Sequence, residues 1–86
     1  MIVYFHKNFE KSYKKLKGAD RKKIKDRLGA FINDPFDSQL NNHPLKGKYE
    51  DYRSINISGD LRAIYKYIND DECVFAEIGT HSELYS

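Results

Sequence analysis

Three short runs between residues 52 and 79 have the composition of β-strands and constrain the fold more than any other feature. They read "YRSINIS" (52–58), "LRAIYKYI" (61–68) and "CVFAEIG" (73–79), and β-branched and aromatic residues are frequent in each. Only "SGD" and "NDDE" lie between the runs, and turns this short connect antiparallel neighbours. The sequence therefore predicts an antiparallel meander of three strands.

The first of these runs alternates between apolar and polar residues, as a strand with one buried face does. Ile55 and Ile57 are expected on one face of the sheet. The other face would carry the polar and aromatic positions, which are Tyr52, Ser54, Asn56 and Ser58.

The region before the meander begins with a strand-like run and then changes to helical spacing. "IVYF" (2–5) is short, β-branched and aromatic, which predicts a first strand. Apolar residues then recur at helical intervals in a segment ending near Gly18 and in a second segment, which we expect Asp20 to cap and Pro35 to end. The two stripes are Phe9, Tyr13 and Leu16, then Ile24, Leu28, Phe31 and Ile32.

These elements give the order β-α-α-β-β-β, an α+β fold with two helices packed on one face of an antiparallel sheet. Residues 37–48, "DSQLNNHPLKGK", contain Asn, Pro and Gly and are predicted to form a loop. A chain of 86 residues has room for one core. We therefore expect a single domain over residues 1–86.

The charge of the chain is unevenly distributed. Residues 7–27 hold ten basic and three acidic residues, a net charge of +7, so the remainder nets −5 against a total of +2. Such asymmetry indicates that the first part of the chain meets a polyanion or an acidic partner. The alternative is that these lysines only solvate the exposed faces of two helices.

Several features favour a cytoplasmic protein without membrane contact. No apolar run is long enough to cross a bilayer, which takes about 18 residues. The start, "MIVYFHKNFEK", has an apolar stretch shorter than that of a signal peptide, usually about 7 residues or more. The single cysteine, Cys73, cannot form an internal disulfide, which agrees with a reducing compartment.

Two of the three histidines are placed where catalytic side chains are often found. His43 lies in the predicted loop and His81 follows the last strand, whereas His6 ends the first strand and is expected to pack or to face solvent. Histidine exchanges protons near neutral pH, so a pair can serve as general base and general acid. Cleavage of RNA by attack of a 2′-hydroxyl on the adjacent phosphate needs this pair and no metal. Cationic side chains would stabilise the phosphate, and the candidates are Arg53, Arg62, Lys46 and Lys48.

A metal site is the competing use of these residues. His43, Cys73 and His81 could meet, but the chain has no CxxC, HExxH or other ligand spacing. It also has no glycine-rich phosphate loop. We therefore expect neither a metal nor another cofactor.

Tyrosine is abundant, with seven residues, and aromatic rings commonly stack on unpaired RNA bases. Tyr49, Tyr52 and Tyr85 lie in the half of the chain assigned to the site. Tyr65 also lies there, but its position inside a strand favours packing.

Three segments together carry a resemblance to a known family. "HPLKGKYEDYRSINI", "LRAIYK" and "GTHSELYS", in this order, resemble the RelE/ParE superfamily of type II toxins, most closely its YafQ branch. The resemblance covers essentially the whole chain and implies a RelE-like fold. It also implies a ribosome-dependent, metal-independent endoribonuclease that cleaves mRNA and is inhibited by a cognate antitoxin, with which it forms a hetero-oligomer.

The resemblance assigns roles to individual residues. It implies that His43, Asp60 and His81 are catalytic, with Asp60 orienting the histidines or sharing their protons. Tyr85 matches a terminal aromatic residue of the branch, and would position the substrate.

Three positions depart from the pattern of the branch. Asn56 replaces a histidine, Leu61 replaces a tryptophan, and Glu77 replaces the arginine that would meet the scissile phosphate. Arg62 could take over the phosphate, and Asn56 could donate hydrogen bonds to RNA. The departures also suit an alternative, a non-catalytic protein of the same fold that only binds its antitoxin or that inhibits DNA gyrase as ParE relatives do.

Overall fold

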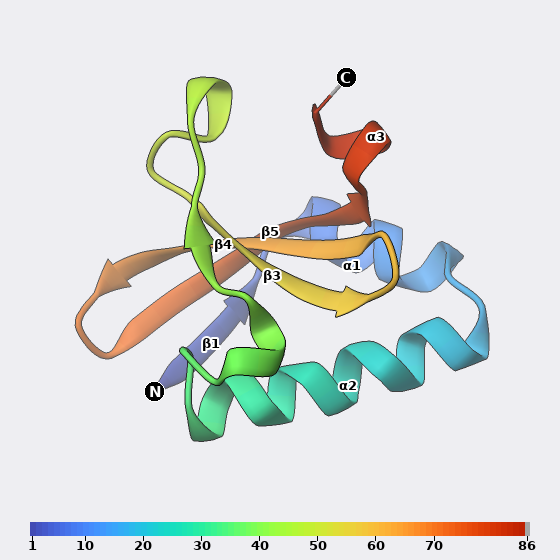
Figure 1. The fold of residues 1–86 in the computed structure, drawn as a ribbon, viewed down its shortest axis with the longest axis horizontal. Helices are drawn as coiled ribbons and strands as arrows, with labels where there is room; N and C mark the ends of the chain where they lie inside the picture. The colour runs from blue at the N-terminus through green and yellow to red at the C-terminus, as the bar shows by residue number, and fades with distance from the viewer. Residues whose placement is uncertain (86) are drawn as a thin grey trace.

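The predicted meander is the centre of the fold in the computed structural model, which describes residues 1–85 (Figure 1). Strands β3 (Arg53–Ser58), β4 (Leu61–Asn69) and β5 (Glu72–Thr80) pair antiparallel in sequence order. Gly59, in the turn between β3 and β4, has a φ of +48°, which glycine adopts without steric penalty. The meander is confirmed.

The complete sheet has five strands in the order β1-β5-β4-β3-β2, and it is mixed rather than wholly antiparallel as predicted. β1 (Ile2–Phe5) pairs in parallel with β5, because the helices that follow it carry the chain away before the meander begins. β2 (His43–Pro44) pairs with β3. It lies within the segment predicted to be a loop, between the short 3-10 helices η1 (Ser38–Leu40) and η2 (Gly47–Tyr49).

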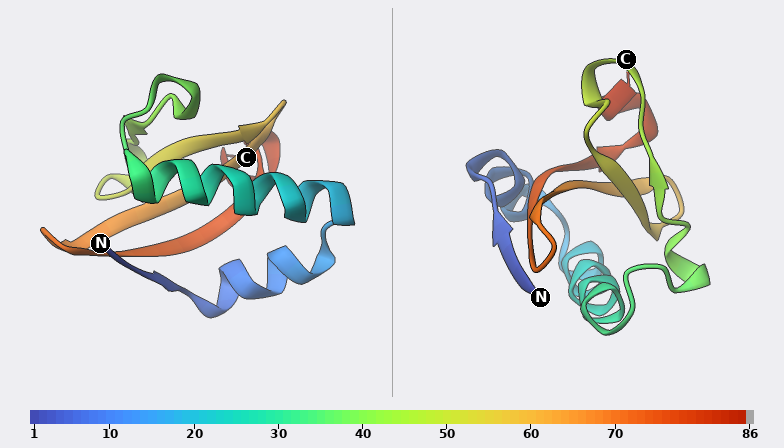
Figure 2. Two further views of the ribbon diagram at one scale, coloured as in Figure 1. Left: turned by 90° about the horizontal axis from the view of Figure 1, so that it is seen from below. Right: turned by 90° about the vertical axis from the view of Figure 1, so that its left-hand side faces the viewer.

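Helices α1 (Lys7–Lys15) and α2 (Gly18–Asn33) cover one face of the sheet (Figure 2). His6 caps α1, because its Nδ1 accepts a hydrogen bond from the backbone N–H of Asn8 at 3.0 Å. The prediction that Asp20 caps α2 is wrong: α2 begins at Gly18, and Asp20 lies in its first turn, where a carboxylate still complements the helix dipole. Within residues 1–85, no helix combines the length and apolar character that a bilayer crossing demands.

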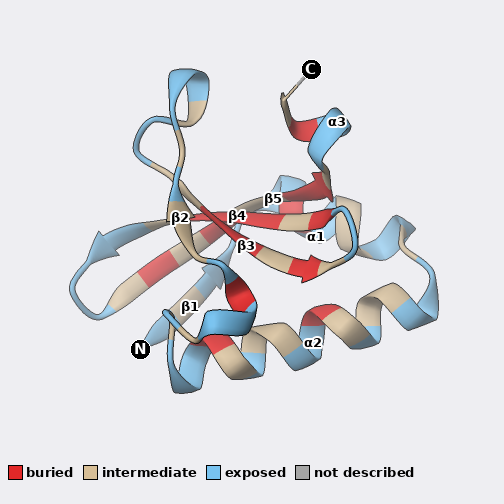
Figure 3. Cartoon of the chain, in the orientation of Figure 1, coloured by how far each residue is buried: buried red, intermediate tan, exposed pale blue. Residues whose placement is uncertain are grey.

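The main core lies between the sheet and the two helices (Figure 3). Phe31 of α2 packs edge-on against Tyr65 and Phe75, with ring centroids 4.8 and 5.2 Å apart. The prediction that Ile32 belongs to the buried apolar stripe is wrong, since Ile32 is 53% exposed. Ile32 is one residue, or about 100° of helix, beyond the buried Phe31.

A bulge in β5 changes the direction of the side chains at its end. Tyr65 pairs with Phe75 whereas Ile64 pairs with Glu77, so Ala76 has no partner in the ladder. Strict alternation after Phe75 would direct Glu77 into the core. Instead Ile78 joins the core and Glu77 shares the opposite face with Ile64, as expected where a bulge shifts the alternation.

Candidate active site

A pocket of about 380 Å³ lies on the face of the sheet opposite the helices. In Figure 1, the segment containing β2 and the short helix α3 (His81–Tyr85) rise on this side of the sheet. Four of the predicted site residues meet in this pocket, together with three that were not predicted. The lining residues are His43, Arg62, His81 and Tyr85, and Asn41, Leu45 and Ser54.

His81 and Tyr85 are held together by α3. Gly79 and Thr80 are the last residues of β5, and α3 follows directly. The spacing of four residues places both rings on one side of the helix, with centroids 4.7 Å apart.

A capping box fixes the start of α3. The backbone N–H of Thr80 donates to Oε1 of Glu83 at 2.8 Å, and the N–H of Glu83 donates to Oγ1 of Thr80 at 3.2 Å. Hydrogen bonding of the Glu83 carboxylate to the Thr80 backbone N–H, and after it to the Thr80 side chain, lowers the pKa of Glu83. The ionised carboxylate therefore stabilises the helix that carries His81.

A glycine at position 79 allows α3 to approach β5 closely. A Cβ atom there would lie 3.3 Å from Glu83 Oε1 and 3.4 Å from Leu84 Cγ, so any other residue would require these side chains to shift by a few tenths of an ångström. Leu84 is buried and anchors α3 against this strand. The glycine of "GTHSEL" thus permits the position of His81.

Asp60 contributes its backbone rather than its carboxylate to this arrangement. The backbone N–H of His81 donates to the Asp60 carbonyl oxygen at 3.3 Å, which ties α3 to the β3–β4 turn. Asp60 itself is exposed and is not among the residues that line the pocket. The structure therefore does not bring its carboxylate to the two histidines, as the predicted proton-sharing role requires.

The hydrogen bond of His43 determines which of its two ring nitrogens can accept a proton. Nδ1 lies 2.8 Å from the carbonyl oxygen of Asn41, and a carbonyl can only accept. Nδ1 therefore carries the proton, and in the neutral ring Nε2 keeps a lone pair. Asn41 has a φ of 45°, in the left-handed region, at the end of η1.

Ser54 and Asn56 of β3 carry polar atoms on the pocket face of the sheet. Ser54 pairs with His43 across β2 and β3, and Asn56 pairs with Arg62 across β3 and β4. Ser54 Oγ and Asn56 Oδ1 are both buried and have no hydrogen-bond partner within residues 1–85. Buried polar atoms without partners are rare, so both are candidates to contact substrate. Ser54 was not singled out from the sequence, although its alternation with Ile55 indicated this face.

Arg62 supplies the positive charge of the pocket. Its Nη1 donates to the carbonyl oxygens of Gly59 at 2.9 Å and Leu61 at 3.3 Å, which holds the guanidinium over the β3–β4 turn. The position agrees with the predicted role of Arg62 toward a phosphate.

Arg53 and Lys46 do not line the pocket. Arg53 Nε donates to Oδ1 of Asn42 at 2.7 Å, and its guanidinium lies 5.2 Å from the centroid of the Phe36 ring. Arg53 alternates with Ile55 and Ile57 and therefore belongs to the helix-covered face. Lys46 is exposed immediately before η2.

Three tyrosine rings, hereafter the tyrosine cluster, pack beside the pocket. They are Tyr49, Tyr52 and Tyr85, with the ring of Tyr49 5.9 Å from that of Tyr52 and 6.1 Å from that of Tyr85. The hydroxyl of Tyr49 donates to Oε2 of Glu77. Burial, followed by this contact with Glu77, raises the pKa of Tyr49 to about 12. Tyr65, by contrast, is fully buried in the core, as we predicted.

The three residues considered as metal ligands do not converge. Cys73 is buried in the core on the helix-covered face, and burial raises the pKa of its thiol to about 11. His43 and His81 line the pocket on the other face.

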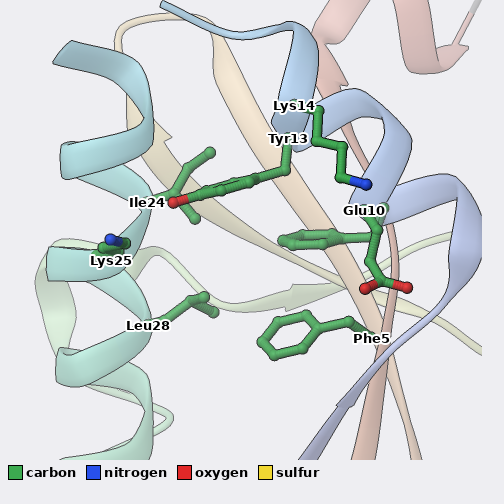
Figure 4. A pocket seen from close by; sticks show the side chains of 8 residues that line it. Phe5, Glu10, Tyr13, Lys14, Ile24, Lys25 and Leu28 are labelled. Carbon is green, nitrogen blue, oxygen red and sulfur yellow. The ribbon is translucent and has the colours of Figure 1, made fainter. Parts of the chain in front are cut away.

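A second hollow, of about 310 Å³, lies between α1 and α2 (Figure 4). We call it the helix groove. Its lining is mainly apolar, with lysines from both helices at its edge: Phe5, Phe9, Tyr13, Ile24 and Leu28, with Glu10, Lys14 and Lys25. Phe5 is 42% exposed there.

Comparison with known proteins relates this chain to one family. The sequence model of the family described as "Bacterial toxin of type II toxin-antitoxin system, YafQ" matches residues 1–86. A curated relative, the mRNA interferase toxin YafQ of Escherichia coli (strain K12), is 32% identical over 68 residues, which cover 77% of this chain and 73% of that protein.

Solved structures agree over nearly the whole chain. The crystal structure of YafQ from E. coli strain BL21(DE3) has a TM-score of 0.83 at 26% identity and covers 98% of this chain and 97% of that one. The toxin in the E. coli DinJ-YafQ toxin-antitoxin complex has a TM-score of 0.79 at 26% identity, over 98% and 96% of the two chains.

Proposed function

Since the chain belongs to the YafQ family of type II toxin-antitoxin toxins, we propose that it is an endoribonuclease that cleaves mRNA on the ribosome without a metal. The observation that carries the proposal is the meeting of His43, His81 and Arg62 in one pocket. Two groups able to move protons and one cation are what phosphodiester cleavage by a 2′-hydroxyl requires.

His43 is assigned as the general base and His81 as the general acid. With Nδ1 of His43 donating to Asn41, Nε2 takes the proton from the ribose 2′-hydroxyl. The 2′-oxygen forms a bond to the adjacent phosphorus while the bond to the 5′-oxygen breaks, and His81 protonates that leaving oxygen. The products are a 2′,3′-cyclic phosphate and a free 5′-hydroxyl, and Arg62 stabilises the charge on the phosphate.

The other groups that would hold the substrate are Tyr85 and Ser54, which line the pocket, and Asn56, which lies on the same face of the sheet but does not line it. The ring of Tyr85, packed against His81, offers a face for an unpaired base, a contact worth about 1 to 3 kcal/mol. The unpartnered oxygens of Ser54 and Asn56 can accept or, for Ser54, also donate a hydrogen bond to ribose or base. The basic helices would contact ribosomal RNA through its phosphates, and salt should weaken that contact steeply.

Substitution of the histidines tests the proposal. We expect His43→Ala and His81→Ala to abolish growth arrest and mRNA cleavage, and primer extension after induction measures the cleavage. The affinity for the antitoxin should remain nearly unchanged. His6→Asn is the matched control, because it removes the third imidazole and keeps a side chain that caps α1. The mechanism is wrong if both alanine variants remain as toxic as the control.

The same experiment separates the alternative function. Glu77 lies on the pocket face and supplies no cation where the resemblance expects an arginine, which favours a protein of this fold that does not cut RNA. Intact transcripts together with DNA damage signalling would indicate gyrase inhibition. Cuts in mRNA that depend on His43 and His81 would exclude it.

The regulatory partner proposed for this chain is a cognate antitoxin that covers the helix groove. The groove has an apolar floor and the lysines Lys14 and Lys25 at its edge. An amphipathic segment with apolar and acidic residues complements both features. Such a segment would also neutralise part of the +7 charge of residues 7–27 and so exclude ribosomal RNA.

A further inference from the structure

The carboxylate of Glu77 is engaged within the protein rather than directed at substrate. Although the bulge at Ala76 turns Glu77 to the pocket face, Glu77 is not among the residues that line the pocket. Its Oε2 accepts the hydroxyl hydrogen of Tyr49, which lies in η2, 28 residues earlier in the chain. We propose that Glu77 is a positioning residue that acts through Tyr49 on the His81–Tyr85 pair, an inference that rests on the proposed ribonuclease function.

A continuous series of contacts connects the carboxylate to the catalytic ring. The Tyr49 ring packs edge-on against that of Tyr85, with centroids 6.1 Å apart and an interplanar angle of 87°. Tyr85 in turn packs at 4.7 Å from the imidazole of His81. A displacement of Tyr49 therefore removes the support on one side of Tyr85, and through it of His81.

The hydrogen bond matters because η2 is otherwise a short turn on a projecting segment. η2 has three residues and rises with the segment between β2 and β3 away from the sheet (Figure 1). A phenol that donates to a carboxylate makes a charge-assisted hydrogen bond, stronger than one between neutral groups. Because Glu77 is part of β5, this bond fixes the tip of the segment to the rigid sheet.

Two lysines lie against the tyrosine cluster that Glu77 contacts. Lys48 Nζ lies 5.1 Å from the centroid of the Tyr49 ring, and Lys66 Nζ lies 5.2 Å from that of Tyr52. Cations above tyrosine faces are attracted by the ring quadrupole. The two lysines therefore offset the negative charge of Glu77 at the tyrosine cluster, so that RNA does not meet an isolated carboxylate there.

The inference makes an unusual prediction for arginine at position 77. If Glu77 faced the scissile phosphate, Glu77→Arg would add an attractive charge and raise the cleavage rate. If Glu77 holds Tyr49, the same change removes the acceptor of the Tyr49 hydroxyl and places a cation with only donors beside it. Cleavage should then fall.

The experiment uses the full chain and ribosome-bound mRNA under single-turnover conditions. For Tyr49→Phe and Glu77→Leu we expect the maximal cleavage rate to fall about 10-fold to 100-fold with little change in half-saturating ribosome concentration, since misplacement of a catalytic group costs that much. Glu77→Gln keeps an acceptor and should retain most of the rate. The double variant should be no slower than the slower single variant, because both remove one interaction.

The chain offers a matched control in a second tyrosine–glutamate pair. Tyr4 donates to Glu72 Oε2 at 2.6 Å between β1 and β5, at the far end of the sheet from the pocket. Tyr4→Phe and Glu72→Gln should leave the cleavage rate within about twofold of the parent, as expected for surface changes without contact to the site. The proposal would be overturned if Tyr49→Phe and Glu77→Leu cleaved mRNA as fast as these controls. It would also be overturned if Glu77→Arg cleaved faster than the parent.

A measurement without RNA separates this inference from the proposed activity. The imidazole proton signals of His81 should carry a ring-current shift from Tyr85, and Tyr49→Phe and Glu77→Leu should reduce that shift while Tyr4→Phe does not. If the parent does not cleave RNA but both variants lose the shift, the positioning is supported and the ribonuclease function is contradicted. An unchanged shift in both variants would contradict the positioning.

Discussion

At the scale of single residues, the pocket differs from ordinary protein surface in its two buried oxygens without partners. Ser54 is fully buried, yet its Oγ has no hydrogen-bond partner within residues 1–85. A buried hydroxyl without a partner costs about 1 to 3 kcal/mol. Such a cost is tolerated most easily where the missing partner is supplied by a substrate.

Ser54→Ala therefore has opposite effects on stability and activity. We expect the free energy of unfolding to stay the same or to rise, because the unsatisfied hydroxyl is removed, and the cleavage rate to fall about 10-fold through the loss of one hydrogen bond to RNA. Thermal denaturation and single-turnover cleavage provide the two measurements. Ser58→Ala, on the same strand, is the control, and a stability loss specific to Ser54→Ala would show that the hydroxyl has a structural partner instead.

Four site residues could be predicted from the sequence because the elements that carry them are local. His43, His81 and Tyr85 lie in short motifs, and Arg62 lies in a strand with clear boundaries. The role of Asp60 could not be decided from the sequence, since a residue of a tight turn can serve through its carbonyl as well as its carboxylate. The meander and the two helices were predictable for the same local reasons, whereas the parallel pairing of β1 and the short strand β2 depend on contacts between distant segments.

At the scale of elements, the bulge in β5 and the cap of α3 determine how the site is built. Simple alternation along the strand "CVFAEIG", starting from the buried Cys73, would bury Glu77. The bulge at Ala76 prevents this, and because it depends on pairing with β4, it left no signal in the sequence. The spacing of Thr80 and Glu83, by contrast, is a capping-box pattern that could have predicted α3.

The capping box predicts that the order of α3 depends on pH. The pKa of Glu83 is lowered in the fold, so its stabilising effect is complete above the ordinary value of 4.5 and is lost as the pH falls through the lowered value. Amide hydrogen exchange of α3 should therefore accelerate relative to the sheet as the pH falls below 4.5. Glu83→Gln should remove this pH dependence and lower cleavage severalfold at neutral pH. Identical exchange in the parent and Glu83→Gln at every pH would contradict the role of the cap.

At the scale of the whole molecule, the two faces of the sheet have separate tasks. The pocket and the tyrosine cluster lie on one face. Helices α1 and α2 cover the other face (Figure 2), and the helix groove lies between them. An antitoxin in the helix groove would leave the pocket open. Inhibition would then come from blocking the basic helices, which the ribosome also needs, so binding of the antitoxin and of the ribosome would be mutually exclusive.

This arrangement predicts that antitoxin binding can be weakened without loss of catalysis. Leu28→Glu places a carboxylate in the helix groove, where an acidic segment would meet like charge and lose an apolar contact. We expect antitoxin affinity to fall at least 10-fold, measured by calorimetry, while the cleavage rate at saturating ribosome concentration changes little, because the pocket is untouched. Ile32→Glu is the control: it adds the same charge one turn later on α2, on an exposed residue outside the groove lining. Because Leu28 packs partly against the core, Lys25→Glu, at the exposed edge of the groove, is a second variant that does not risk the fold. If the antitoxin binds both groove variants as tightly as it binds Ile32→Glu, its segment does not occupy the helix groove, and inhibition must act at the pocket face.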